Sequence, residues 1–232
     1  MKLWATYYHM PTVRPSWTSV AAKPLIDRKG NPVSPPLSPQ DWCDAAMQGS
    51  VWVDNGNDAP TAYMYVDSGG PEQVVCDRYF GELSSGIKNA TRRARFAPFY
   101  HPQACDVRPI PLMPFRTIAV DRKRIRMGTV LYVPKLRGKT FWTNGEFFTH
   151  DGYLIASDKG GAIEVNHIDM FVEDAAVDPL PDIVRSNSRG SFDAYMVDKD
   201  HPMAVALREA GDEICKDSDR PGRPRKKAAS SI

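Results

Sequence analysis

The stretch YLIASDKGGAIEVNHIDMFVE, residues 153–173, contains two short apolar runs joined by a pair of glycines. Asp158 follows the first run and Asp169 lies inside the second, so the two carboxylates are eleven residues apart. Gly160 and Gly161 stand beside Asp158, where the lack of a side chain lets the backbone approach a bulky neighbour closely. The pattern predicts two strands that bring acidic groups to one place.

A second stretch, FRTIAVDRKRIRMGTVLYVP at residues 115–134, has the same character. An apolar strand signal ends at Asp121, a cationic turn that includes Lys123 follows, and Gly128 precedes another apolar run. Short strand signals then continue to residue 173 without a long helix between them, which is typical of a closed or nearly closed β-barrel.

The remaining chain carries weaker signals. Residues 3–9 read as a first strand, and the proline-rich residues 21–39 read as a loop. Ser38, Pro39 and Gly49 predict the cap, first residue and end of a short helix. Strands are expected at 50–53, 61–66 and 72–76, and a helix near 84–95. A second amphipathic helix should begin at Pro202 with Asp200 as its cap, and its apolar stripe consists of Met203, Leu207, Ala210 and Ile214.

Composition and charge exclude some classes of protein. Apolar residues make up 42% of the 232, enough for a packed core, and no run is long enough to span a bilayer. The net charge is +2, but residues 220–232 hold five basic side chains and no acid, so residues 1–219 are net negative. We therefore expect a flexible basic tail, solvated or touching a polyanion, on a protein that does not bind nucleic acid.

The cysteines and histidines give no metal-binding pattern. Cys43, Cys76, Cys105 and Cys215 form no C-x-x-C pair, so they allow either two disulfides, in three possible pairings, or four buried thiols. The five histidines are scattered and form no H-E-x-x-H motif. We expect no catalytic metal and no cofactor.

Taken together, the two stretches resemble the membrane-bound lytic transglycosylase A family and the related three-aspartate (3D) domain proteins. The resemblance rests on an A-V-D motif at Ala119–Asp121, on Gly128, on D-x-G-G-A-I from Asp158, and on the I-D pair that ends at Asp169. It covers residues 115–173 and a first strand at ATYYH. The chain departs from the family pattern at RKRIRMG, where extra cations such as Lys123 would lie beside a substrate groove.

This resemblance implies a mainly β fold: a six-stranded double-psi β-barrel with an inserted region and a C-terminal helix. The expected barrel comprises residues 1–20 and 111–175, with the inserted region at 21–110. A helical segment would follow at 176–219, and the flexible basic tail at 220–232. We expect a monomer without a transmembrane segment.

The resemblance also implies an activity: cleavage of peptidoglycan glycan strands between N-acetylmuramic acid (MurNAc) and N-acetylglucosamine (GlcNAc), with a 1,6-anhydro product. Asp169 would be the catalytic acid and base, supported by Asp158 and Asp121. Gly160, Gly161, Lys123, His167, Thr6 and Tyr7 are candidate substrate contacts. His167 could instead be structural, and Thr6 and Tyr7 could pack in the core. Such an enzyme would act in the cell envelope or periplasm, or after secretion.

One other function stays open at this point, and a second, nucleic-acid binding, is disfavoured. A non-catalytic barrel that binds cell-wall glycan would share the same fold. A nucleic-acid-binding protein would use the basic tail and the cationic groups at 88–95 and 122–126, although no such binding motif is present.

Overall fold

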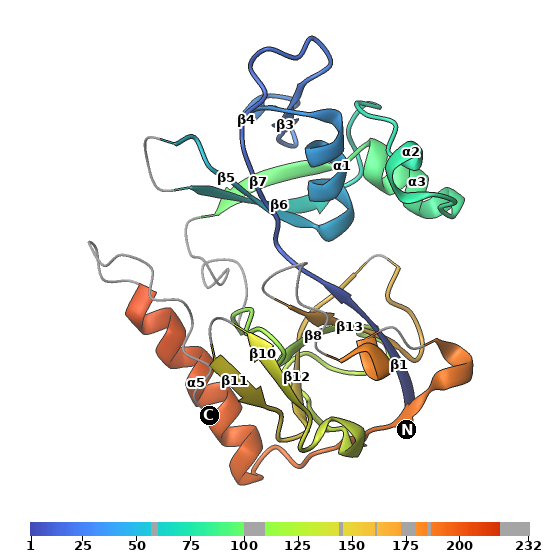
Figure 1. Ribbon diagram of the computed structural model, residues 1–232, viewed down its shortest axis with the longest axis vertical. Coiled ribbons are helices and arrows are strands. Elements are labelled where there is room, and N and C mark those ends of the chain that lie inside the picture. The colour runs from blue at the N-terminus through green and yellow to red at the C-terminus, as the bar shows by residue number, and fades with distance from the viewer. Residues whose placement is uncertain are drawn as a thin grey trace. The chain divides into compact units, whose positions relative to one another are not determined.

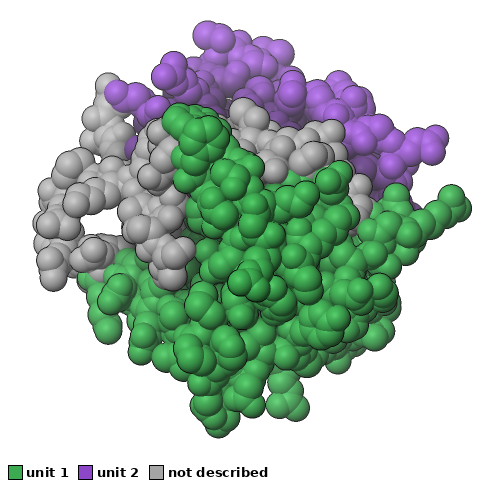
Figure 2. Space-filling view, turned by 60° about the horizontal axis from the view of Figure 1, so that its bottom comes forward, with its two compact units in different colours: residues 1–9, 101–232 green, residues 10–100 purple. Residues whose placement is uncertain are grey.

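The structure is a computed structural model that describes residues 1–56, 60–99, 110–143, 146–160, 162–172, 180–184 and 187–218. Packing divides the chain into two compact units (Figures 1 and 2). Unit 1 comprises Met1–His9 and His101–Ile232, and unit 2 comprises Met10–Tyr100. The expected inserted region, 21–110, overlaps most of unit 2, and the expected tail, 220–232, lies outside the described residues.

Unit 1 is built mainly from short strands. These are β1 (Lys2–Tyr8), β8 (Thr117–Val120), β9 (Val130–Tyr132), β10 (Thr140–Thr143), β11 (Glu146–Thr149), β12 (Tyr153–Asp158), β13 (His167–Phe171), β14 (Phe192–Asp193) and β15 (Tyr195–Met196). The helical elements are η1 (Pro134–Leu136), α4 (Pro181–Val184), η2 (Ser188–Gly190) and α5 (Pro202–Ser218).

Seven of these strands form one sheet in the order β14-β1-β13-β8-β12-β9-β15. The pairs β1–β13 and β8–β12 are parallel, whereas β13–β8 and β12–β9 are antiparallel. The first strand of the chain therefore lies directly beside β13, which is more than 150 residues away in sequence. All four residues of β8 are buried, because this strand lies in the centre of the sheet.

The core of unit 1 is aliphatic and aromatic. Leu3 and Ala5 of β1 pack with Ile118 and Val120 of β8 and with Ile168 of β13. Helix α5 covers a second apolar cluster, in which Leu207 packs with Met113, Val130 and Ile155. The predicted C-terminal helix and its packing on the body are confirmed.

Unit 2 contains β2 (Thr12–Val13), β3 (Lys23–Ile26), β4 (Pro32–Leu37), α1 (Pro39–Gln48), β5 (Ser50–Val53), β6 (Thr61–Asp67), α2 (Asp77–Phe80), α3 (Ser85–Arg92) and β7 (Arg95–Phe99). Its sheet has the order β2-β5-β6-β7, and β3 pairs with β4 in a hairpin. The hydroxyl of Ser38 caps α1, and Gly49 ends it in the left-handed conformation, as predicted.

The cysteines described in the structure are oxidised. Cys43 of α1 forms a disulfide with Cys76, which precedes α2, and Cys215 is also disulfide-bonded. The alternative of buried thiols is therefore wrong for these three residues. Cys105 lies outside the described residues.

Three local predictions are wrong. Residues 72–76 form no strand, because Gln73 bonds the backbone at Arg92 and Ala94 and Cys76 is held by its disulfide. The proline-rich residues 21–39 contain the β3–β4 hairpin, since proline is tolerated on edge strands. Helix α5 is capped by the ring nitrogen Nδ1 of His201, which accepts from the Met203 N–H, and not by Asp200.

The predicted class, mainly β with a C-terminal helix, is confirmed. The described sheet of unit 1 has seven strands, two of which are the two-residue strands β14 and β15. Closure into a six-stranded double-psi barrel stays a prediction.

Candidate active site

Three adjacent strands of unit 1 bring Asp158 and Asp169 to the same level of the sheet. Ala119 on the central strand β8 pairs with Asp169 on β13 and with Asp158 on β12. The register of β12 shifts between Ala156 and Asp158, and this irregularity places Asp158 opposite Ala119. Two carboxylates distant in sequence thus flank one small residue.

Asp169 is held in place by β1, the other strand that pairs with β13. Thr6 pairs with Asp169 in the parallel register, and its hydroxyl lies 2.7 Å from the Oδ1 atom of Asp169. The same hydroxyl lies 2.8 Å from the Nε2 atom of His167. His167 in turn stacks on Trp4, with ring centroids 3.6 Å apart and planes 6° from parallel. The alternation of β1 puts Trp4, Thr6 and Tyr8 on this face.

The surroundings of Asp169 favour its neutral form. Burial of the carboxyl raises the pKa of Asp169 to about 6, and the negative charge of Asp158 adds to the rise, while a hydrogen bond from Thr6 opposes it. Among the described residues, Asp169 has no ion-pair partner that would hold it ionised. This carboxyl can therefore carry a proton near neutral pH.

Asp158 is held in place by two donors. The Tyr8 hydroxyl donates to its Oδ2 atom at 2.9 Å, and the Lys159 backbone N–H donates to Oδ1 at 2.7 Å. These two hydrogen bonds orient the carboxyl group of Asp158 beside Asp169.

Asp121 has a different environment from Asp169. Hydrogen bonds from the backbone N–H groups of Lys123 and Val165 hold the pKa of Asp121 below its usual range. The carboxylate therefore links the turn after β8 to the loop before β13. Val165, in that loop, has a φ of 57°, a backbone conformation that non-glycine residues rarely adopt.

The other predicted residues are spread around this centre. The side chain of Lys123 is exposed, and Tyr7 points to the opposite face of β1, where it packs against the core. A Cβ atom on Gly160 would lie 2.5 Å from Cγ1 of Ile163, so glycine is needed there for close packing. Gly161 lies outside the described residues. The substrate roles of these residues stay predictions.

Sequence reasoning missed the contribution of Trp4. Only its position two residues before Thr6, on the same face of β1, could have indicated it. Trp4 and His167 line a hollow of about 470 Å³ in unit 1, together with Lys2, Ala162, Glu164, Val165, Asn166, Ser188 and Ser191.

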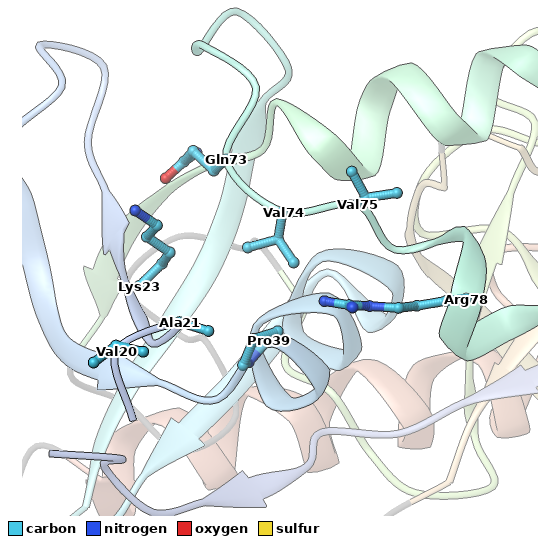
Figure 3. Close-up of a pocket in the computed structure, with 8 residues that line it drawn as sticks. All are labelled: Val20, Ala21, Lys23, Pro39, Gln73, Val74, Val75 and Arg78. Carbon is cyan, nitrogen blue, oxygen red and sulfur yellow. The ribbon is translucent and has the colours of Figure 1, made fainter. Parts of the chain in front are cut away.

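Unit 2 has a hollow of its own. Figure 3 shows its apolar wall, which includes Val74, Val75 and Pro39, and the two cationic side chains at its sides, Lys23 and Arg78. Both cations are exposed, and this hollow contains no carboxyl group that could act as an acid.

Within the described ranges, no helix is long and apolar enough to cross a membrane. No group of three or more acidic, histidine or cysteine side chains in the described part of the chain is arranged to hold a metal ion.

A comparison with protein families gives one match. The family model described as the 3D domain matches residues 116–177, a segment that contains Asp121, Asp158 and Asp169. No curated protein sequence matches this chain.

Several solved structures are similar in fold. The structure of Escherichia coli MltA with bound chitohexaose is 16% identical, with a TM-score of 0.48 and coverage of 74% of this chain and 65% of that chain. MltA from Neisseria gonorrhoeae is 16% identical, with a TM-score of 0.47 and coverage of 83% and 71%. A membrane-bound lytic murein transglycosylase from Agrobacterium tumefaciens is 16% identical, with a TM-score of 0.45 and coverage of 74% and 67%. This chain thus spans less than two thirds of the Escherichia coli structure.

Proposed function

We propose that this protein is a peptidoglycan lytic transglycosylase, and the match of residues 116–177 to the 3D domain model supports this proposal. The protein cleaves the β-1,4 bond between MurNAc and GlcNAc in glycan strands, and Asp169 is its single general acid and base. For the fold, we propose that the sheet of unit 1 closes as the expected six-stranded double-psi barrel.

The proposed reaction needs one carboxyl group that can first give and then take a proton. Neutral Asp169 protonates the glycosidic oxygen as its bond to the anomeric carbon of MurNAc breaks. The 6-hydroxyl of the same sugar then attacks that carbon and gives its proton to the Asp169 carboxylate. The product is a 1,6-anhydro ring, no water is consumed, and Asp169 ends in its starting state.

The observation that carries this proposal is the environment of Asp169. With a pKa of about 6, about one molecule in ten keeps the proton at pH 7, whereas an ordinary aspartate keeps it in fewer than about one in a thousand. A raised pKa at a carboxyl group that is partly exposed is characteristic of catalytic acids.

The neighbouring groups have supporting roles in this proposal. Asp158 opposes ionisation of Asp169 by its negative charge, and Tyr8 holds Asp158 in position. Asp121 ties together the two loops that border the site. The sugar would be met by the Trp4–His167 side of the site, with Thr6, Lys123, Gly160 and Gly161 as further candidate contacts. Tyr7 packs against the core instead.

The place of action follows from the substrate. Peptidoglycan lies in the cell envelope, so we propose that the protein works there. The Cys43–Cys76 disulfide supports this proposal, since disulfides persist in oxidising compartments.

The test is digestion of purified sacculi, followed by mass spectrometry of the released muropeptides. We expect 1,6-anhydro products from the wild type, and a loss of activity of about 10²- to 10⁴-fold in Asp169→Asn. Asp212→Asn, which removes an exposed carboxylate on α5, serves as the matched control and should retain activity.

The products also separate the alternatives. Reducing-end muropeptides would identify a hydrolase. Binding to sacculi without any release of muropeptides would identify a non-catalytic glycan-binding protein.

A further inference from the structure

The Thr6 hydroxyl lies between two groups that compete for its single proton. It is 2.7 Å from Oδ1 of Asp169 and 2.8 Å from Nε2 of His167. A hydroxyl donates one hydrogen bond at a time and accepts others through its oxygen. The direction of the Thr6–Asp169 bond therefore depends on the state of His167.

The hydrogen bond made by the other ring nitrogen of His167, Nδ1, determines which tautomer the ring adopts. The ring hydrogen-bonds the backbone carbonyl of Ala162, which can only accept. Because Nε2 faces Thr6, we assign the Ala162 bond to Nδ1–H. Burial lowers the pKa of His167, which favours the neutral ring, and the stack on Trp4 holds its orientation. A neutral ring with its proton on Nδ1 presents Nε2 to Thr6 as an acceptor.

Only one arrangement then satisfies all three side chains when Asp169 is protonated. The Asp169 O–H donates to the Thr6 oxygen, and the Thr6 O–H donates to Nε2 of His167. If Asp169 ionises, the Thr6 proton must turn to the carboxylate, and Nε2 loses its donor. His167 thus favours the neutral form of Asp169 without touching it.

The other polar groups around Asp169 do not substitute for this effect. On β12, Asp158 accepts a hydrogen bond from the Tyr8 hydroxyl of β1. On β8, the residue opposite Asp169 is Ala119, and Asp121 beyond it is bonded to backbone N–H groups. Lys159 and Lys123 are exposed, and among the described residues neither forms an ion pair with Asp169.

We propose that His167 is a positioning residue that acts on Asp169 through Thr6, taking the hydroxyl proton so that the Thr6 oxygen accepts the proton of the acid. The purpose of this arrangement rests on the proposed function. When Asp169 gives its proton to the departing oxygen, the Thr6 hydroxyl turns to donate to the new carboxylate. When Asp169 regains a proton from the 6-hydroxyl, Thr6 turns back to His167, which stays neutral throughout.

The test is a carbon-13 NMR titration of the Asp169 carboxyl, assigned with Asp169→Asn. In His167→Phe, which keeps a ring on Trp4, Thr6 donates only to the carboxylate, so the pKa of Asp169 should fall by about 1. In Thr6→Val, the carboxylate loses its donor, and the pKa should rise by about 1. Thr6→Ser is the matched control, since it keeps the hydroxyl and should keep the wild-type pKa.

Opposite shifts in the two variants support the proposal, because a general loosening of the site would move both in one direction. An unchanged pKa in His167→Phe, or shifts of the same sign, overturns it. A second measurement uses the wild-type protein and does not depend on a variant that folds. Nitrogen-15 NMR should find neutral His167 protonated at Nδ1, and a ring protonated at Nε2 overturns the proposal. None of these NMR measurements requires cleavage of glycan. If the pKa values shift as expected but sacculi stay intact, the proposed function is refuted and the role of His167 is not.

Discussion

Asp169 in unit 1 and Asp67 in unit 2 are both partly buried aspartates on a strand of their unit's sheet. Asp67 accepts from the guanidinium groups of Arg95 and Arg28, and the bond from Arg95 is the main cause that lowers the pKa of Asp67 to about 2. Asp169 faces a hydroxyl and another carboxylate, and burial raises its pKa to about 6. Within one chain, the pKa of an aspartate carboxyl is therefore lowered in one place and raised in another.

The difference shows that ionisation of Asp169 near neutral pH lowers the stability of the folded protein. In unit 2, Asp77 is paired in the same way as Asp67, with Arg92 and Lys88 as its cations. Unit 1 leaves Asp169 without such a partner among the described residues, although one arginine would lower the cost of ionising it. A carboxyl kept unpaired in this way is better explained by chemistry than by stability.

The largest expected effect concerns Asp169. A folded-state pKa above the unfolded value contributes stability that is present below about pH 4 and is lost as the pH rises through about 6. Asp169→Asn, which cannot ionise, should therefore raise the free energy of unfolding by about 2–3 kcal/mol at pH 7 and hardly at pH 4. Urea unfolding at the two pH values checks this, and a destabilised variant at pH 7 would contradict the comparison.

Asp67 should show the opposite sign. Its lowered pKa contributes stability that is present above about pH 4 and is lost as the pH falls through about 2. Asp67→Asn should cost about 1 kcal/mol at pH 7, since the pair is partly exposed and solvent screens it. The same unfolding experiment measures the loss, which 1 M salt should reduce. If Asp67→Asn stabilises the protein, the pairing in unit 2 has no energetic value.

The smallest effect concerns Asp158. Its charge raises the pKa of Asp169 less than burial does. In Asp158→Asn that pKa should fall slightly, so cleavage of sacculi at pH 7 should decrease by about two- to threefold and recover at lower pH. A rate profile between pH 5 and pH 8 tests this. A loss that is equal at every pH would instead indicate that Asp158 itself contacts substrate or holds the site together.

Much of the fold was predictable because the signals were local. The capping serine, the proline and the glycine of α1 each act within a few residues, and the strands from β8 to β13 follow apolar runs. The predictions failed where contacts from elsewhere prevailed. The run at 72–76 has strand-forming residues but no ladder partner, and the prolines of β4 are accommodated on an edge.

The candidate site was predictable in part. The motifs predict Asp169, Asp158 and Asp121 as candidate residues, but they do not reveal the environments of these side chains. Asp121 is bonded to backbone N–H groups, whereas Asp169 bonds a side chain on a strand from the start of the chain. Trp4 and its stack on His167 had no sequence signal beyond the alternation of β1.

The amino-acid order alone determined that this chain forms short strands with three aspartates on them or directly after them, since apolar periodicity and turn residues act over a few positions. Only the tertiary structure decided which aspartate can keep a proton. That choice depends on the register of β1 against β13 and on the shift in β12, which place Thr6 and Asp158 around Asp169. The physical reason is that a pKa responds to burial and charge within a few ångströms in space, however distant those groups are along the chain.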